Sequence, residues 1–508
     1  MGTTSERIVK NTLFLYIRMA VSIVTNIFTT RILLEALGAS DYGLYNVVGG
    51  AIAMLGFVTA SMSSATQRFI NYVEGEHDIE KSKEVLNNAL IIHYGIAAIS
   101  VLIFVCAGFI FFNGVLNIPP GRESAAMAIY GCMIFSTTFS ITVVPYDASI
   151  NAHENMLFYS IVGIADVLFK LFIAISVIFI DNDKLILYGI LMALESWLIR
   201  VITQQYCKHH YKECQNINLK KYYNRHRIKE MTSFAGWNLL NIASGMISLY
   251  GMNIVINHYF GTQVNAAQAV ATQLSGVLMG VSMNMIKAIT PAMVKKESGH
   301  QRTQMLELSY VGCKFSFLLF SFFSIPVIFY MDDILRLWLH DVPSWTNIFC
   351  IIMICSTLIE QMFVLLYQTI MAQGNIKNYN IARSIVNLTP IIISIAMMEY
   401  MAFPPYWVLL NWLIWKSVIG SLINLIYAKK NVELSIRMFA KRVILTCSGC
   451  TVSIVLLNIA IKELQKYTNT NFILLLIVTA IISLPIYYII GMNKSEKETT
   501  IKLISKII

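Results

Sequence analysis

The sequence has little charge. Asp, Glu, Lys and Arg make up 13% of its 508 residues, whereas hydrophobic residues make up 56%. The charged share is about half the 25% that is usual in soluble domains, and a water-soluble chain needs a more charged surface. Ten prolines and 26 glycines are too few for a collagen-like or disordered chain, and nine cysteines are too few for a disulfide scaffold. The composition is that of an integral membrane protein.

Long polar loops are also lacking. The longest predicted loop, residues 207–230, is too short to be a soluble catalytic domain. The rest is mostly apolar segments that reach the roughly 20 residues of a membrane-spanning helix. They are too long for barrel strands and do not alternate, so we expect an all-α polytopic membrane protein. The sequence predicts about fourteen transmembrane helices, at 11–37, 41–65, 85–113, 124–150, 157–180, 185–206, 231–256, 262–290, 305–331, 345–373, 379–400, 404–428, 441–461 and 470–491.

The basic residues of the predicted loops are divided unequally. With a cytoplasmic N-terminus, the inner segments carry 25 Lys and Arg residues, among them Lys502 and Lys506, and the outer segments carry five. This asymmetry follows the positive-inside rule and predicts that both termini are cytoplasmic. The net charge of +10 is explained by topology and anionic lipid, and no motif indicates nucleic-acid binding. The five outer residues are Arg122, Lys184, Arg336, Lys462 and Lys466.

The two halves of the chain resemble each other. A shift of 223 residues aligns Gly38 with Gly261 and Glu74–His77 with Glu297–His300. A shift of 221 aligns residues 146–155 with residues 367–376. Six helices per half make the repeat parallel, as in transporters that have a cavity between two bundles. We therefore expect two pseudo-symmetric six-helix bundles and two C-terminal helices, with boundaries at 1–206, 207–230 (a basic cytoplasmic inter-lobe loop), 231–430 and 431–508.

Ionisable residues within the spans are candidates for function, because a charge at the bilayer centre costs about 3 kcal/mol. Some lie far from any predicted helix end, while others are near enough for snorkelling to the headgroups to explain them equally well. Polar positions on the first helix, Arg18 included, form one stripe, which indicates a wetted cavity. The candidate substrate-binding cations are Arg18, Lys314, Lys416, Arg31, Lys287 and Arg383.

The sign of these charges indicates the substrate. A cavity lined by Arg and Lys favours an anion, and a diphosphate suits both groups. Isolated carboxylates can carry a proton or bind sodium, so Glu360 and Glu195 are candidates for ion coupling. Asp166 and Lys170 are two further ion-coupling candidates; they lie four residues apart, which fits a structural pair and a cavity lining equally. We expect no catalytic residue, metal or cofactor; Cys447–Cys450 spells C-x-x-C, but inside an apolar helix.

Residues 10–18, 37–50 and 62–69 resemble the opening of an O-antigen-type polysaccharide-biosynthesis flippase. This family belongs to the multidrug/oligosaccharidyl-lipid/polysaccharide exporter superfamily. Its most recognisable element is the turn L-G-x-x-D/E-Y-G, here Leu37–Gly43, and residues 367–375 resemble the end of its tenth helix.

The resemblance implies a transporter in the bacterial inner membrane that moves an undecaprenyl-diphosphate-linked oligosaccharide to the outer leaflet. Ion-coupled alternating access of two six-helix lobes would drive it, with a proton or sodium as coupling ion. Glycan polymerase or assembly proteins are expected partners of a monomeric chain, and the lipid bilayer is its solvent. Two alternatives are a cation-coupled drug or metabolite exporter and, less favoured by the short outer loops, a membrane glycan polymerase or ligase.

Overall fold

The computed structural model describes residues 4–53, 56–112, 121–179, 183–339, 342–400, 403–468, 471–494 and 496–498. Lys502 and Lys506 lie outside these ranges, as does the side chain of Lys466. The described residues form helices and connecting loops, with no strand among them. The expected all-α fold of a polytopic membrane protein is confirmed.

The number of membrane-spanning helices is close to the predicted fourteen. Twelve helical segments of the described residues are long and apolar enough to cross a membrane. A bent pair of helices, Thr346–Gln361 and Val364–Gln373, passes the same test when taken together and brings the number to 13 if it is counted as one span. The remaining predicted span, 41–65, includes the end of the helix Thr4–Ala53 and the start of the helix Gly56–Glu76. Residues 54 and 55, between these two helices, lie outside the described residues.

The chain divides into two compact units. One is Val9–Leu239, and the other is Met1–Ile8 with Leu240–Ile508. The inter-lobe loop, residues 207–230, lies in the first unit, and the last two helices lie in the second. The dividing point, between residues 239 and 240, lies inside a helix.

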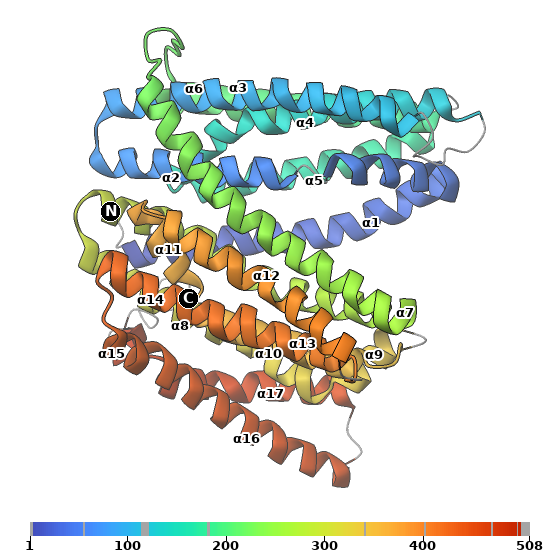
Figure 1. Cartoon of the computed structure of the whole chain (residues 1–508), viewed down its shortest axis with the longest axis vertical. Coiled ribbons are helices and arrows are strands. Elements are labelled where there is room, and N and C mark those ends of the chain that lie inside the picture. The colour runs from blue at the N-terminus through green and yellow to red at the C-terminus, as the bar shows by residue number, and fades with distance from the viewer. Residues whose placement is uncertain are drawn as a thin grey trace. The chain divides into compact units, whose positions relative to one another are not determined.

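The first unit contains α1 (Thr4–Ala53) from Val9 onward, α2 (Gly56–Glu76), α3 (Ile79–Ile110), α4 (Glu123–Ala152), α5 (Met156–Ile178), α6 (Lys184–His210) and the start of α7 (Arg225–Ser298). α4 is its centre and packs against α2, α3, α5 and α6 (Figure 1). Asp78, Asn155 and Asp183 accept hydrogen bonds from the first backbone N–H groups of α3, α5 and α6. These side chains stabilise the start of each helix, because the backbone N–H groups of the first turn have no partner within the helix.

The inter-lobe loop is held on α3 by hydrogen bonds. The Asn88 side chain donates to the Tyr222 carbonyl at 2.8 Å and accepts from the Asn224 backbone N–H at 3.0 Å. The Asn218 backbone N–H donates to Asn87 at 3.1 Å. These bonds explain why the loop belongs to the first unit.

The second unit contains the remaining residues of α7 and all helices that follow. α8 (Arg302–Phe329) packs against α10 (Thr346–Gln361), α11 (Val364–Gln373), α16 (Leu445–Thr468) and α17 (Phe472–Ile486), and the short α9 (Met331–Trp338) follows α8. α12 (Lys377–Tyr400) contacts α13 (Tyr406–Trp412), which continues as a π-helix (Leu413–Ile419) and then as α14 (Gly420–Val432). Between α14 and α16 lie α15 (Ile436–Phe439) and a second π-helix (Ala440–Ile444), and a third (Tyr487–Gly491) follows α17.

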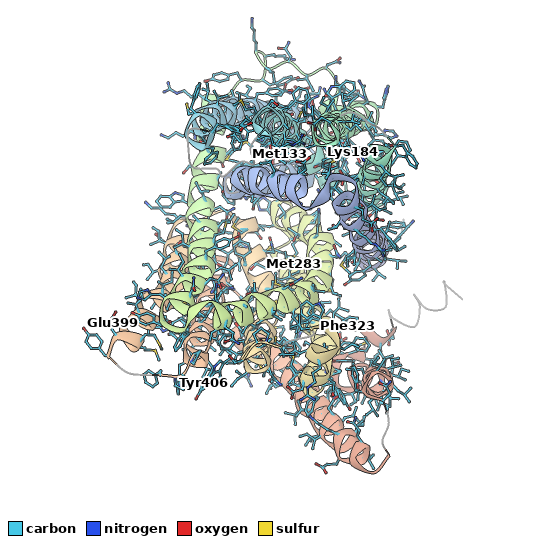
Figure 2. The ribbon with its side chains drawn as sticks, turned by 90° about the vertical axis from the view of Figure 1, so that its right-hand side faces the viewer. Met133, Lys184, Met283, Phe323, Glu399 and Tyr406 are labelled. Atoms are coloured by element: carbon cyan, nitrogen blue, oxygen red, sulfur yellow. The ribbon has the colours of Figure 1, made fainter. Side chains whose placement is uncertain are left out.

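One end of α12 is tied to α7. Tyr259 donates its hydroxyl to the exposed Glu399 carboxylate at 2.8 Å. Glu399 and Tyr406 appear at the same edge of this unit in Figure 2.

The backbone repeats at the positions that the sequence aligns. Gly38 interrupts α1 at φ 76° and Gly261 interrupts α7 at φ 79°, a left-handed conformation that glycine adopts without a Cβ clash. His77 and His300, which are not glycines, also have positive φ, at 57° and 55°. Their backbone N–H groups donate to Glu74 and Glu297 at 3.2 and 3.1 Å. The internal repeat is therefore confirmed at these positions.

Candidate functional site

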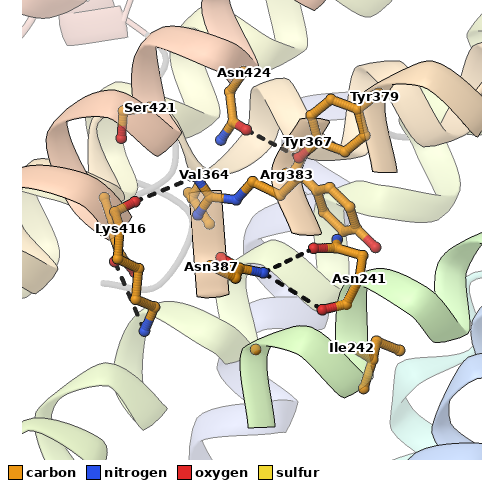
Figure 3. A pocket seen from close by; sticks show the side chains of 12 residues that line it. Asn241, Ile242, Val364, Tyr367, Tyr379, Arg383, Asn387, Lys416, Ser421 and Asn424 are labelled. Carbon is orange, nitrogen blue, oxygen red and sulfur yellow. Dashed lines mark hydrogen bonds and ion pairs between the residues drawn. The ribbon is translucent and has the colours of Figure 1, made fainter. Parts of the chain in front are cut away.

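The second unit contains a pocket of about 270 Å³. Side chains from α7, α10, α11, α12, the first π-helix and α14 line it (Figure 3). This volume is slightly below the roughly 300–1,000 Å³ of ligand pockets, so it suits one polar group of a larger molecule. The lining residues are Asn241, Ile242, Gly245, Glu360, Val364, Tyr367, Tyr379, Arg383, Asn387, Lys416, Ser421 and Asn424.

Two irregular helical segments contribute to the pocket wall. α10 and α11 meet at a 43° bend between Gln361 and Val364, directly after Glu360. Lys416 lies in the π-helix, which has wider turns than an α-helix. Such segments are rare in proteins, and those that occur often lie at functional sites. Each of these two charged residues thus lies where a regular α-helix is interrupted.

Glu360 and Lys416 form a loose ion pair. Oε1 of Glu360 lies 3.9 Å from Nζ of Lys416, and the two side chains are 26% and 31% exposed. The same oxygen accepts a hydrogen bond from the Ser417 hydroxyl at 2.8 Å. Nζ of Lys416 also lies 4.9 Å from the centre of the Trp412 ring, a cation–π distance. Lys416 is thus held between a carboxylate and an aromatic ring, with part of its surface open.

Arg383 brings a second cation to the pocket. Its Nη1 donates to the Lys416 carbonyl at 3.2 Å (Figure 3). Of the twelve lining residues, Arg383 and Lys416 are basic and Glu360 is acidic. The ionised lining therefore has a net charge of +1, and the arrangement favours an anion.

Amide and phenol groups fix the uncharged wall. Asn387 donates to the Asn241 side-chain oxygen at 3.2 Å and to the Ser244 hydroxyl at 3.0 Å. The Tyr379 hydroxyl donates to Asn424 at 2.9 Å. These bonds link α12 to α7 and to α14, so they hold the helices that carry Arg383.

The first unit has a separate cluster of predicted residues. Arg18 of α1 lies with its guanidinium 4.4 Å from the centre of the Tyr159 ring. On the same helix as Tyr159, Lys170 and Asp166 form an ion pair at 2.8 Å. Glu195 of α6 is buried, at 5% exposure. The cluster contains both signs of charge, unlike the cation-rich pocket.

The repeat relates the two sites. An offset of 221 residues takes Asp166 to Asn387 and Glu195 to Lys416. Two acidic positions of the first unit thus correspond to an amide and a lysine in the second. The second unit is the more basic of the two at these positions.

The other predicted cations lie elsewhere. Arg31 pairs with Glu35 at 3.2 Å on an exposed face of α1, and Lys287 is half-buried on α7. Lys314 is only 4% exposed, and its Nζ lies 2.5 Å from Glu496, near the C-terminal end of the described residues. None of the three lines the pocket.

Arg383, Lys416 and Glu360 can be recognised in the sequence because they are charged residues within apolar spans, whereas the neutral wall of the pocket is not predicted. Asn387 and Asn424 are amides inside apolar spans, and Tyr379 is fully enclosed. Their signal in the sequence is weak, because membrane helices also use such residues for packing.

All nine cysteines are free thiols, including Cys447 and Cys450. Among the residues that the structure describes, no group of three or more His, Cys, Asp or Glu side chains is arranged to hold a metal ion.

The fold is that of the MATE transporters. No family model matches the chain, and no curated protein matches it in sequence. Solved structures do match: a point mutant of a MATE protein has a TM-score of 0.73 at 11% identity, over 85% of this chain and 97% of that one. A MOP-superfamily transporter from Pyrococcus furiosus, described by the reverse polarity of its binding pocket, has a TM-score of 0.71 at 11% identity, over 85% and 96%. The Vibrio cholerae MATE transporter VcmN in its bent form has 0.67 at 13%, over 85% and 98%.

Proposed function

We propose that the chain is a membrane transporter that moves an undecaprenyl-diphosphate-linked oligosaccharide from the inner to the outer leaflet of a bacterial inner membrane. Its two units would alternate in access, with both termini in the cytoplasm. The observation that carries this proposal is the pocket of the second unit, where Arg383 and Lys416 face one carboxylate, Glu360. The MATE fold supports transport as the activity.

The pocket suits the diphosphate rather than the whole substrate. Guanidinium and ammonium groups both form strong charge-assisted hydrogen bonds with phosphate oxygens. A volume of about 270 Å³ holds such a group but no oligosaccharide of several sugars. The sugars and the lipid would therefore lie outside this pocket during transport.

The candidates for ion coupling are the carboxylates within the membrane-spanning helices. Glu360 lies within the pocket, whereas Asp166, Lys170 and Glu195 belong to the cluster of the first unit. Buried ionisable groups in membrane helices are typical of proton and ion pathways. We propose that a proton or sodium ion acts at one of these carboxylates during the transport cycle.

A second candidate is a drug or metabolite exporter that is coupled to a cation. Glu360 in the pocket favours it, since a carboxylate can bind a cationic drug. One structural neighbour is a multidrug resistance MATE transporter with a TM-score of 0.70 and 11% identity. The basic excess of the pocket argues for the anionic substrate. The structurally similar Pyrococcus furiosus transporter has a binding pocket of reverse polarity, which is described as suggesting a different function for that protein.

Deletion of the gene separates the candidates. For a flippase, undecaprenyl-linked repeat units accumulate on the cytoplasmic leaflet with their covalent structure unchanged, and the surface glycan is lost. For a drug exporter, the glycan is normal and drug sensitivity changes. Normal export of the glycan in a strain without a redundant transporter would contradict the flippase proposal.

A further inference from the structure

Two arginines of the candidate sites lie directly on helix glycines. A Cβ atom built on Gly420 would lie 1.5 Å from Nη1 and 2.5 Å from Cζ of Arg383. A Cβ atom on Gly163 would lie 2.0 Å from Nε and 2.4 Å from Cζ of Arg18. Neither glycine has a positive φ. Their backbone therefore does not require glycine, whereas the guanidinium groups do require the space.

The other described glycines differ in what surrounds them. A Cβ atom on Gly312 or Gly251 would meet an apolar side chain, Leu365 or Ile391. Gly276 and Gly280 have no atom within 4 Å of an added Cβ. At Gly163 and Gly420 the atoms against this position belong instead to a charged side chain. Close helix packing explains glycines that face apolar side chains, such as Gly312 and Gly251, but it does not explain glycines that contact a guanidinium group.

We propose that Gly420 is a positioning residue for Arg383, and that Gly163 has the same role for Arg18. The proposal rests on the proposed function, because it concerns how the anion-binding pocket is arranged. Gly420 follows the π-helix directly, so the guanidinium lies over the backbone of α14 while Nη1 donates to the Lys416 carbonyl. That carbonyl and the bare glycine surface together fix the guanidinium before a ligand arrives.

Fixing the guanidinium in advance lowers the cost of binding. A free arginine side chain loses rotamer entropy when a ligand immobilises it, and this loss weakens binding. An arginine held between Gly420 and the Lys416 carbonyl has lost much of that freedom already. The pocket then binds an anion more tightly than the same charges on mobile side chains would.

An alanine at position 420 separates this role from a packing role. Its methyl group would displace the end of a flexible side chain, which the fold tolerates. Alanine also has a higher helix propensity than glycine. The Gly420→Ala variant should therefore unfold at the same or a higher temperature while its pocket loses affinity. A glycine needed for packing would give a lower unfolding temperature instead.

The first experiment measures binding of inorganic pyrophosphate to the full chain in detergent. We expect about tenfold weaker binding for Gly420→Ala and no change for Gly280→Ala, the matched control in the same unit. In the Arg383→Ala background, Gly420→Ala should have no further effect, because the displaced side chain is gone. Wild-type affinity in Gly420→Ala, or full additivity with Arg383→Ala, would overturn the proposal.

A second experiment needs no ligand. Phenylglyoxal modifies accessible arginines, and mass spectrometry gives the rate at Arg383 separately. We expect faster modification of Arg383 in Gly420→Ala than in the wild type, and an unchanged rate in Gly280→Ala. Equal rates would overturn the positioning role. If pyrophosphate does not bind the wild-type chain but the rates differ as expected, the substrate proposal fails and the positioning role stands.

The same two readouts apply to the first unit. Gly163→Ala should speed the modification of Arg18, and Gly131→Ala on α4 is its control, because nothing lies within 4 Å of an added Cβ there. An unchanged rate at Arg18 would restrict the positioning role to Gly420.

Discussion

Replacing Lys416 by alanine tests how much a single positive charge of the pocket contributes to anion binding. Two unit charges 3.9 Å apart attract by about 4 kcal/mol at an effective dielectric constant of 20. Both side chains are about one-quarter to one-third exposed, and solvent reduces such pairs to about 1 kcal/mol or less. A charge-assisted hydrogen bond from Lys416 to a phosphate contributes about 1.5–3 kcal/mol. We take about 2 kcal/mol as the loss, which is about a 30-fold increase in Kd.

The loss has two parts that a double-mutant cycle separates. Lys416→Ala removes an attractive charge and leaves Glu360 without this partner, facing an incoming anion. We therefore expect the double variant Lys416→Ala with Glu360→Gln to recover part of the affinity.

Binding of inorganic pyrophosphate to the purified chain measures both effects. Lys441→Ala is the control, since this lysine lies outside the pocket. A Kd for Lys416→Ala within twofold of the wild type would refute the electrostatic reasoning. A double variant that binds no better than Lys416→Ala would exclude repulsion by Glu360.

Three further predictions concern other residues. Arg122 donates to Asp183 at 2.7 Å and to Asp41, so Arg122→Ala should lower the free energy of unfolding by about 2 kcal/mol after allowance for solvent. Burial raises the pKa of Asp183, but Arg122 and the backbone N–H groups of Ile186 and Leu185 lower it further, to a net value below its ordinary one. The stabilisation is therefore complete above the ordinary aspartate pKa and disappears as pH falls through the lowered value; a loss that is independent of pH in thermal unfolding would contradict this. Glu360→Gln should change the dependence of transport on a proton or sodium gradient, and unchanged dependence would make this carboxylate structural. Arg18→Ala should reduce glycan export at an unchanged protein level in the membrane, whereas wild-type export would assign Arg18 to packing.

Much of the fold could be predicted because its signals are long or repeated. Apolar segments of about 20 residues have few alternatives in a membrane protein. Gly38 and Gly261 stood out by their shared offset, and the structure gives both the same left-handed conformation. The ion pair of Arg122 with Asp41 also gives the L-G-x-x-D/E-Y-G turn a structural role, since Asp41 is its acidic position.

The details of the site depended on geometry that local sequence does not encode. The bend after Gln361 and the π-helix around Lys416 contain no proline from which they could be predicted. Lys314 was deep enough in its span to be a cavity candidate, but its partner is Glu496, 182 residues further along the chain. Depth in a helix predicts that a charge needs a partner, yet it cannot tell a substrate from a carboxylate of the same chain.

The most direct test of the account is transport itself. The purified chain is reconstituted into liposomes that contain fluorescent undecaprenyl-diphosphate-linked oligosaccharide, and movement between leaflets is followed by quenching from outside. We expect movement by the wild-type chain and by Lys441→Ala, and a large loss of movement in Arg383→Ala and Lys416→Ala. Movement at the wild-type rate in both pocket variants would contradict the role of this pocket. No movement by the wild-type chain under an imposed proton or sodium gradient would contradict the proposed substrate.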